Sequence, residues 1–183
     1  MEDTDRLTLE AITLAPYIQK ATALIGLSRR NGGNQFRHSM STMAILIDYG
    51  YIDPVLLKSA VIHDLFEDFP QADPAAIRRL DPDGDEVVQL VYEVTRRDEP
   101  KCDFMARIRD HGSYLAKVLK VADRISNLTD LQPGVFPPRK IESYLDETEE
   151  FVVPMAHEVD RNMAVEVEDL IRRRREILSW ERH

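Results

Sequence analysis

Charged side chains interrupt an apolar, helix-forming segment at residues 60–69, and this segment limits the folds that the chain can adopt. The stretch reads AVIHDLFEDF and contains His63, Asp64, Glu67 and Asp68. On a helix with about 100° per residue, Glu67, Asp64 and Asp68 lie about 40°, 100° and 140° around the axis from the histidine, so all four share one face. The opposite face is apolar and suited to burial. The segment therefore predicts a core helix that presents one imidazole and three carboxylates to a single space.

A solvated acidic face on a surface helix is the alternative interpretation of this segment. Solvation accounts for the acids, but it does not account for a histidine beside them among apolar residues. Three carboxylates this close repel one another near pH 7 unless a positive group compensates them. The grouping therefore favours a bound cation or another positive partner over solvation alone.

The rest of the chain has the three- and four-residue apolar spacing of helices and few alternating β-branched runs. The predicted helices cover residues 7–27, 36–50, 54–68, 74–80, 85–96, 104–110, 114–131 and 138–175. Breaks are expected in the first near Pro16 and in the last near Pro154, because proline cannot donate to the preceding turn. We therefore predict an all-α fold, and the length favours a single domain over residues 1–183.

Composition excludes several classes of protein. The net charge of −9 argues against a nucleic-acid partner, because that affinity comes mainly from basic residues. The acidic N-terminus and the lack of a run of eighteen apolar residues predict a cytoplasmic protein with no membrane partner. The single cysteine, Cys102, excludes an internal disulfide. No feature defines an oligomeric partner.

Further polar residues stand inside other apolar helical segments. Asp123 lies within VLKVADRISNL, where an unpaired carboxylate would be costly, and Asn127 is beside it on the same face. His38 opens the amphipathic segment HSMSTMAILI. Together with His63 and Asp64, His38 and Asp123 make a set of two imidazoles and two carboxylates. Such a set suits a divalent metal such as Mn, Fe, Co or Zn, held between helices of a bundle.

The order H, then HD, then D on helices resembles the HD-domain metal-dependent phosphohydrolase superfamily. HDLFED resembles the HDxxED motif of the hydrolase domain in RelA/SpoT-type enzymes, which remove the 3′-pyrophosphate from guanosine tetraphosphate and pentaphosphate. VADRISNL, VYEVTRR and ETEEFVVPMA resemble that family's ADRxxN, VTK and ETLExYxPLA segments, and RRNGGNQFRH resembles its RKSGxPYxxH. The resemblance covers residues 29–157 and implies an HD-domain helical bundle, of the size of a small alarmone hydrolase.

The resemblance also implies roles for the residues of the charged helix. The implied metal ligands are His38, His63, Asp64 and Asp123, and manganese is the family's usual ion. The implied catalytic residues are Glu67 and Asp68, an acidic pair that positions or deprotonates the attacking water. Together these roles predict hydrolysis of a nucleotide substrate.

Substrate contacts are implied by the same comparison. Arg29 and Arg30 would lie near the base and the phosphates, and Asn127 would line the nucleoside pocket. Ser126 departs from the family's histidine before this asparagine, and the family's Arg-Thr pair is replaced by Thr-Asp ending at Asp130. Because an ionised aspartate only accepts hydrogen bonds, a substrate-binding Asp130 leaves both guanine and adenine open as the base.

Two alternatives stand beside alarmone hydrolysis. One is another HD phosphohydrolase activity, either removal of the 2′-phosphate from NADPH or hydrolysis of a nucleotide phosphomonoester or phosphodiester. The other is a nucleotide-sensing module without turnover, against which the intact ligand set and acidic pair count.

Overall fold

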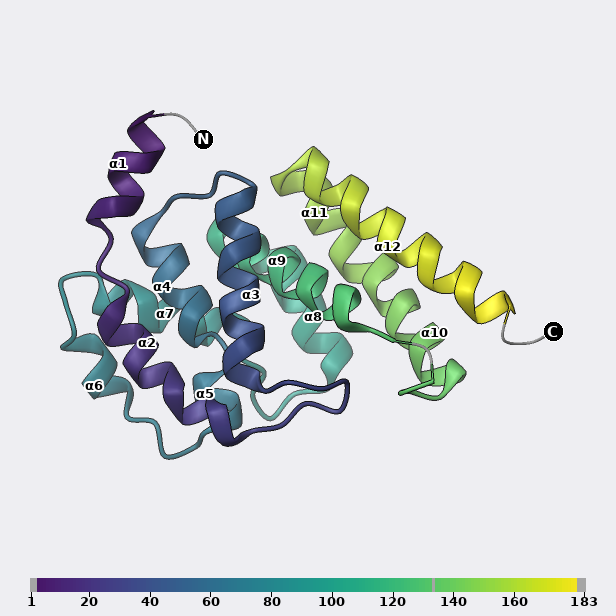
Figure 1. Ribbon diagram of the computed structural model, residues 1–183, viewed down its shortest axis with the longest axis horizontal. Helices are drawn as coiled ribbons and strands as arrows, with labels where there is room; N and C mark the ends of the chain where they lie inside the picture. Colours follow the sequence, from purple (N-terminus) through teal and green to yellow (C-terminus); the bar gives the residue numbers. More distant parts are fainter. Residues whose placement is uncertain (1–2, 133, 181–183) are drawn as a thin grey trace. The chain divides into compact units, whose positions relative to one another are not determined.

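The computed structural model describes residues 3–132 and 134–180, and this part of the chain is almost entirely helical (Figure 1). It includes an isolated antiparallel bridge between Ser28 and Asn34. The predicted all-α class is confirmed. None of the described helices is long and apolar enough to cross a membrane.

The helices group into two compact units. One comprises the described residues of Met1–Arg29 and Gly33–Asp98, and the other those of Arg30–Gly32 and Glu99–His183. The single domain over residues 1–183 stays a prediction, and residues 1, 2, 133 and 181–183 lie outside the described part of the chain.

The first unit is built around a buried helix. Its elements are α1 (Asp3–Ala11), α2 (Ala15–Ala21), the 3-10 helix η1 (Thr22–Gly26), α3 (Gln35–Asp48), α4 (Pro54–Ile62), α5 (Leu65–Asp68), α6 (Pro74–Arg78) and α7 (Gly84–Val94). Helices α2, α3 and α7 pack around α4, whose residues from Leu56 to Ile62 are all buried. Pro54 pre-sets the first turn of α4, and Asp53 caps it by accepting from the Leu56 N–H at 2.8 Å. The helix that leads to the HD residues is therefore held on all sides.

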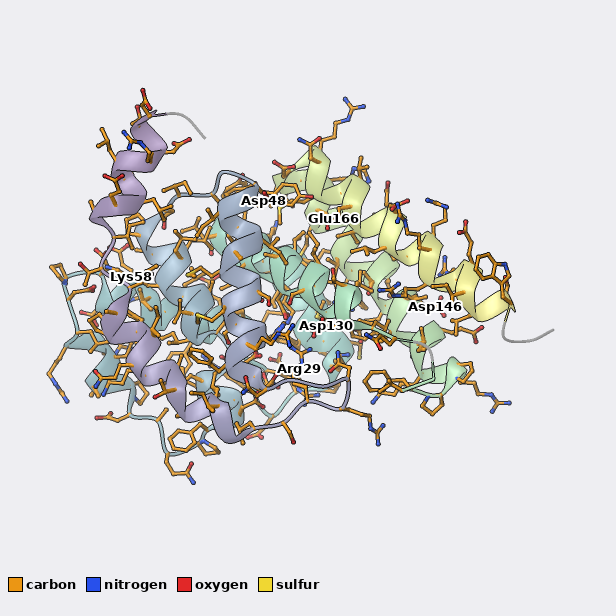
Figure 2. All side chains as sticks on the ribbon, viewed as in Figure 1. Arg29, Asp48, Lys58, Asp130, Asp146 and Glu166 are labelled. Atoms are coloured by element: carbon orange, nitrogen blue, oxygen red, sulfur yellow. The ribbon has the colours of Figure 1, made fainter. Side chains whose placement is uncertain are left out.

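One of these buried residues is charged: Lys58 on α4 (Figure 2). Its ammonium donates to Asp81 at 2.7 Å and to Asp83 at 2.6 Å, both in the turn between α6 and α7. The Tyr17 hydroxyl donates to the same Asp81 carboxylate at 2.8 Å. Burial disfavours the charged form of Lys58, but the two carboxylates outweigh it and raise the pKa of the ammonium. This network joins α2 and the α6–α7 turn to α4.

The second unit is a set of longer helices. Its elements are α8 (Lys101–His111), α9 (Tyr114–Asp130), α10 (Pro138–Glu147), the π-helix η2 (Thr148–Val152), α11 (Val153–Val159) and α12 (Arg161–Trp180). Helices α9, α11 and α12 pack against one another, and eleven residues of α9 are buried. Helix α9 is thus the central element of this unit.

The break predicted near Pro154 lies elsewhere. Pro154 falls within the first two residues of α11, directly after the π-helical turn, where its missing N–H is tolerated. The chain leaves helical geometry at Asp160, whose backbone is extended and whose carboxylate accepts from the Asn162 and Met163 N–H groups. By contrast, the break near Pro16 is confirmed, since α1 ends at Ala11 and α2 begins at Ala15.

We expect the substitution Lys58→Met to destabilise the first unit by about 3 kcal/mol, because it leaves Asp81 and Asp83 without their cation. The measurement is the free energy of unfolding from urea titrations. The control is Lys140→Met, at an exposed position of α10, which should change it by less than about 0.5 kcal/mol. Equal effects of the two substitutions would contradict this expectation.

The same network predicts a pH dependence of stability. Burial tends to raise the pKa of Asp81, but the hydrogen bonds from Lys58 and Tyr17 lower it overall. As the pH falls through the ordinary aspartate pKa of about 3.9, Asp81 therefore binds a proton in the unfolded chain more readily than in the folded chain. The contribution of Asp81 to stability is present above that pH and is lost as the pH falls toward the folded pKa. Acid titrations of the unfolding free energy should be steeper for the wild type than for Lys58→Met, and equal slopes would refute the assignment.

Candidate metal and hydrolytic site

The first candidate ligand, His38, lies one turn into α3. Asn34 caps this helix with its side chain, which accepts from the Arg37 N–H at 2.8 Å. The amphipathic pattern of α3 turns the His38 side of the helix inward, so the imidazole is only 4% exposed. The sequence thus fixes both the start of the helix and the inward direction of this histidine.

The next two candidates, His63 and Asp64, lie between helices rather than within one. The predicted continuous helix over residues 54–68 is wrong, because α4 ends at Ile62 and α5 begins at Leu65. His63 Nδ1 lies 2.9 Å from the Ala60 carbonyl oxygen. In an uninterrupted α-helix that carbonyl would accept from the Asp64 N–H, so the imidazole N–H competes with the helical hydrogen bond.

The three side chains of His38, His63 and Asp64 converge. Asp64 Oδ2 lies 3.3 Å from His63 Nε2 and 3.7 Å from His38 Nε2. The two imidazole rings meet edge to face, with centroids 5.2 Å apart. One ligand atom from each residue lies within 4.8 Å of the other two. Ligands about 2.1 Å from a shared ion lie about 3–3.5 Å apart, so this trio fits a divalent metal.

The tautomer of His63 supports the same role. A carbonyl oxygen only accepts, so the contact with Ala60 places the proton on Nδ1 of the neutral ring. Nε2, which faces Asp64, then carries the lone pair that a metal ligand needs. A backbone carbonyl bonded to the other nitrogen is the usual way in which proteins orient a ligating histidine.

The acidic pair follows the trio on α5, and each member has a different hydrogen-bond donor. Glu67 Oε2 accepts from the backbone N–H of Arg96 at 3.3 Å. Asp68 Oδ2 accepts from the Gln35 side-chain amide at 2.5 Å. Burial and the nearby Asp64 charge raise the pKa of Asp68, against the opposing effects of the amide and the histidines. A raised pKa makes a carboxylate a stronger base, as proton abstraction from water requires.

Asp123 lies on α9, in the second unit, and is 6% exposed. Lys120 Nζ donates to its Oδ2 at 2.8 Å, and Asn127 Nδ2 donates to its Oδ1 at 2.6 Å. The predicted proximity of Asn127 is therefore present. The neighbouring Arg124 has other partners. Its guanidinium donates to Thr148 and Glu147 at 2.7 Å each and lies over the Tyr144 ring.

The candidate substrate residues are divided between the two units. Arg29 belongs to the first unit, where its N–H donates to the Gly33 carbonyl in a turn with positive φ at Gly33. Arg30 belongs to the second and lies over the Phe136 ring, with 5.8 Å from guanidinium carbon to centroid. The Asp130 side chain is exposed.

Two side chains cap the end of α9 that carries Asn127 and Asp130. The Arg174 guanidinium of α12 donates to the Leu128 and Thr129 carbonyls, at 3.0 and 2.9 Å from Nη2. Asn31 Nδ2 donates to the Asp130 carbonyl at 3.1 Å. These donors satisfy carbonyls that a helix end leaves without intrahelical partners.

The structure therefore brings together His38, His63, Asp64 and the acidic pair in one unit. Asp123 and Asn127 form their own cluster on α9 in the other. The joining of Asp123 to the trio, and the substrate contacts of Arg29, Arg30, Asn127 and Asp130, stay predictions.

Comparison with known proteins identifies the fold. No protein-family model and no curated protein sequence matches the chain. The structure is similar to that of a metazoan ortholog of SpoT that hydrolyzes ppGpp and plays a role in starvation responses, with a TM-score of 0.76. The match has 24% sequence identity and covers 88% of this chain and 94% of that one. The chain therefore shares the helical fold of this ppGpp-hydrolyzing protein.

Three contacts of this chain were missing from the sequence interpretation. Lys120 is the cation beside Asp123, and its position one helical turn earlier was a usable signal. Gln35 stands one turn before His38, but nothing in its spacing relates it to Asp68. The Arg96 N–H is a backbone group, so residue type carries no sign of its bond to Glu67.

We expect His63→Ala to weaken Mn²⁺ binding by at least about 100-fold, because it removes one of three converging ligands. Isothermal titration calorimetry with the metal alone measures the dissociation constant. His157→Ala is the matched control. His157 is exposed, lies on α11 and pairs with Glu168, and it does not belong to the converging trio. Unchanged binding in His63→Ala would contradict the metal assignment.

Proposed function

We propose that the chain is a metal-dependent phosphohydrolase that removes the 3′-pyrophosphate from (p)ppGpp-like alarmone nucleotides. The observation that carries the proposal is the convergence of His38, His63 and Asp64 next to an acidic pair on α5. The similarity to a ppGpp hydrolase supports the reaction type, and the motifs at residues 29–157 support the substrate class.

The proposed ligands are His38, His63, Asp64 and Asp123, and Mn²⁺ is the proposed ion. The ion would supply a Lewis acid that activates water and polarises a phosphoryl oxygen. For Asp123 to join the set, its carboxylate must exchange the ammonium of Lys120 for the metal. One cation then replaces another beside the same buried carboxylate, so the Asp123 charge keeps a positive partner.

The acidic pair would act on the attacking water. Asp68 would accept the proton, and Glu67 would orient the water from the neighbouring position on α5. The water oxygen attacks the phosphorus next to the ribose 3′-oxygen and stays with the pyrophosphate. The bond between that phosphorus and the 3′-oxygen breaks, and the 3′-oxygen takes up a proton to become a hydroxyl.

Substrate binding would rely on local positive charge, because the chain as a whole is acidic. Arg29 and Arg30 are proposed to contact the phosphates and the base, through guanidinium groups that match phosphate geometry. Asn127 and Asp130 are proposed to lie at the nucleoside. An ionised Asp130 accepts hydrogen bonds from the exocyclic amine of either purine, so guanosine and adenosine alarmones are both proposed substrates.

The test is product analysis with Mn²⁺ and three substrates: guanosine tetraphosphate, its adenosine counterpart and NADPH. We expect pyrophosphate from an alarmone, and a loss of about 10²- to 10⁴-fold in kcat in the Glu67→Ala, Asp68→Ala double variant. The control pair is Asp85→Ala with Glu86→Ala, two adjacent exposed acids in the first turn of α7, which should retain turnover.

Other products would redirect the proposal. Orthophosphate from NADPH alone would indicate a 2′-phosphatase, and release from a simple nucleotide ester would indicate a phosphomonoesterase or phosphodiesterase. Nucleotide binding without turnover, in protein that holds Mn²⁺, would indicate a sensing module.

A further inference from the structure

Gln35 occupies a fixed position at the entrance to α3. It is the first residue of this helix, and Asn34 before it is the N-cap. Its backbone N–H donates to the Leu27 carbonyl at 3.0 Å, just after η1 ends. His38 follows one turn later on the same helix. The backbone of Gln35 is therefore anchored before its side chain makes any contact.

The side chain of Gln35 contacts Asp68 through a donor. Its Nε2 lies 2.5 Å from Asp68 Oδ2, and both side chains are half-buried. An ionised carboxylate only accepts, so the amide nitrogen, not the amide oxygen, must face it. The contact engages Oδ2 and leaves Oδ1 with acceptor capacity for a water molecule.

The two members of the acidic pair differ in how they are held. Glu67 accepts from a backbone N–H, which every residue except proline would supply at position 96. Asp68 accepts from a side chain, so its orientation depends on the identity of residue 35. Gln35 is also uncharged. A lysine or arginine there would bind the carboxylate more strongly and lower its basicity, whereas an amide orients it and leaves its charge uncompensated.

We propose that Gln35 is a positioning residue that holds Asp68 in the orientation needed for proton abstraction. It does so from the helix that carries His38, so one element sets both a metal ligand and the base. Gln35 touches Asp68 and acts through it. The inference rests on the proposed function, because it requires Asp68 to act on the attacking water.

The test compares two variants that match glutamine in size. Gln35→Met keeps the length and removes the donor, and Gln35→Glu keeps the shape and places an acceptor against the carboxylate. We expect kcat for alarmone hydrolysis to fall about 10-fold in Gln35→Met, and about 100-fold in Gln35→Glu, where two carboxylates repel. KM and the Mn²⁺ dissociation constant should stay within about 2-fold of wild type. Gln89→Ala, at an exposed position of α7, is the control and should match wild type.

A double-mutant cycle separates positioning from a purely structural role. If Gln35 acts only through Asp68, then Gln35→Met should cause no further loss of kcat in the Asp68→Ala background. An equal loss with and without Asp68 would overturn the proposal. So would a rise in KM with unchanged kcat, because that would make Gln35 a substrate contact.

A measurement without turnover keeps this inference distinct from the proposed function. In ¹⁵N-labelled protein, the side-chain amide resonances of Gln35 should shift when Asp68 is replaced by alanine and should stay in place in the Asp85→Ala control. No shift would overturn the inference even if alarmone is hydrolysed. A clear shift in a protein that hydrolyses none of the three substrates would refute the proposed function and, with it, the catalytic purpose of the contact.

Discussion

The hydrogen bond between His63 Nδ1 and the Ala60 carbonyl is the interaction on which the site depends. It competes for a carbonyl that would otherwise continue α4, and the chain turns at His63 and Asp64 before α5 begins. The turn sets His63 Nε2 toward Asp64, and α5 with the acidic pair begins directly after it. The same imidazole thus lies where a helix ends, has its tautomer set by a carbonyl and presents a candidate ligand atom. The buried α4, held by its cap and its ion-pair network, supplies the rigid support for this turn.

Much of the fold followed from the sequence because helices are local structures. Apolar spacing predicted the helical segments, and Pro16 marked a real interruption. The prediction of one helix over residues 54–68 was wrong. The periodicity of AVIHDLFEDF cannot reveal that a side chain competes for a backbone acceptor. The break expected near Pro154 was also wrong, because this proline lies in the first two residues of α11, where its missing N–H is tolerated, and the break is at Asp160.

The site was predicted in part. The sequence identified His63 and Asp123 as candidate site residues, because polar side chains are costly to bury without a partner. Their partners were harder to predict, because two residues on different helices can meet at any separation in the sequence. Gln35 and Asp68 are 33 residues apart, and Glu67 meets a backbone group rather than a side chain. Lys120 was the exception, since its distance of one helical turn from Asp123 could have been used.

The cap on α9 has a consequence for the order in which the chain becomes structured. Arg174 donates to carbonyls 45 and 46 residues earlier in the sequence. During synthesis from the N-terminus, α9 emerges well before α12, so its last carbonyls must first be solvated by water. The end of α9 that carries Asn127 and Asp130 therefore reaches its final hydrogen bonding only late in translation, and non-local closure of this kind is slow compared with helix formation. In a nascent chain, the turn at His63 and Asp64 would be synthesised long before the end of α9 acquires its last hydrogen bonds.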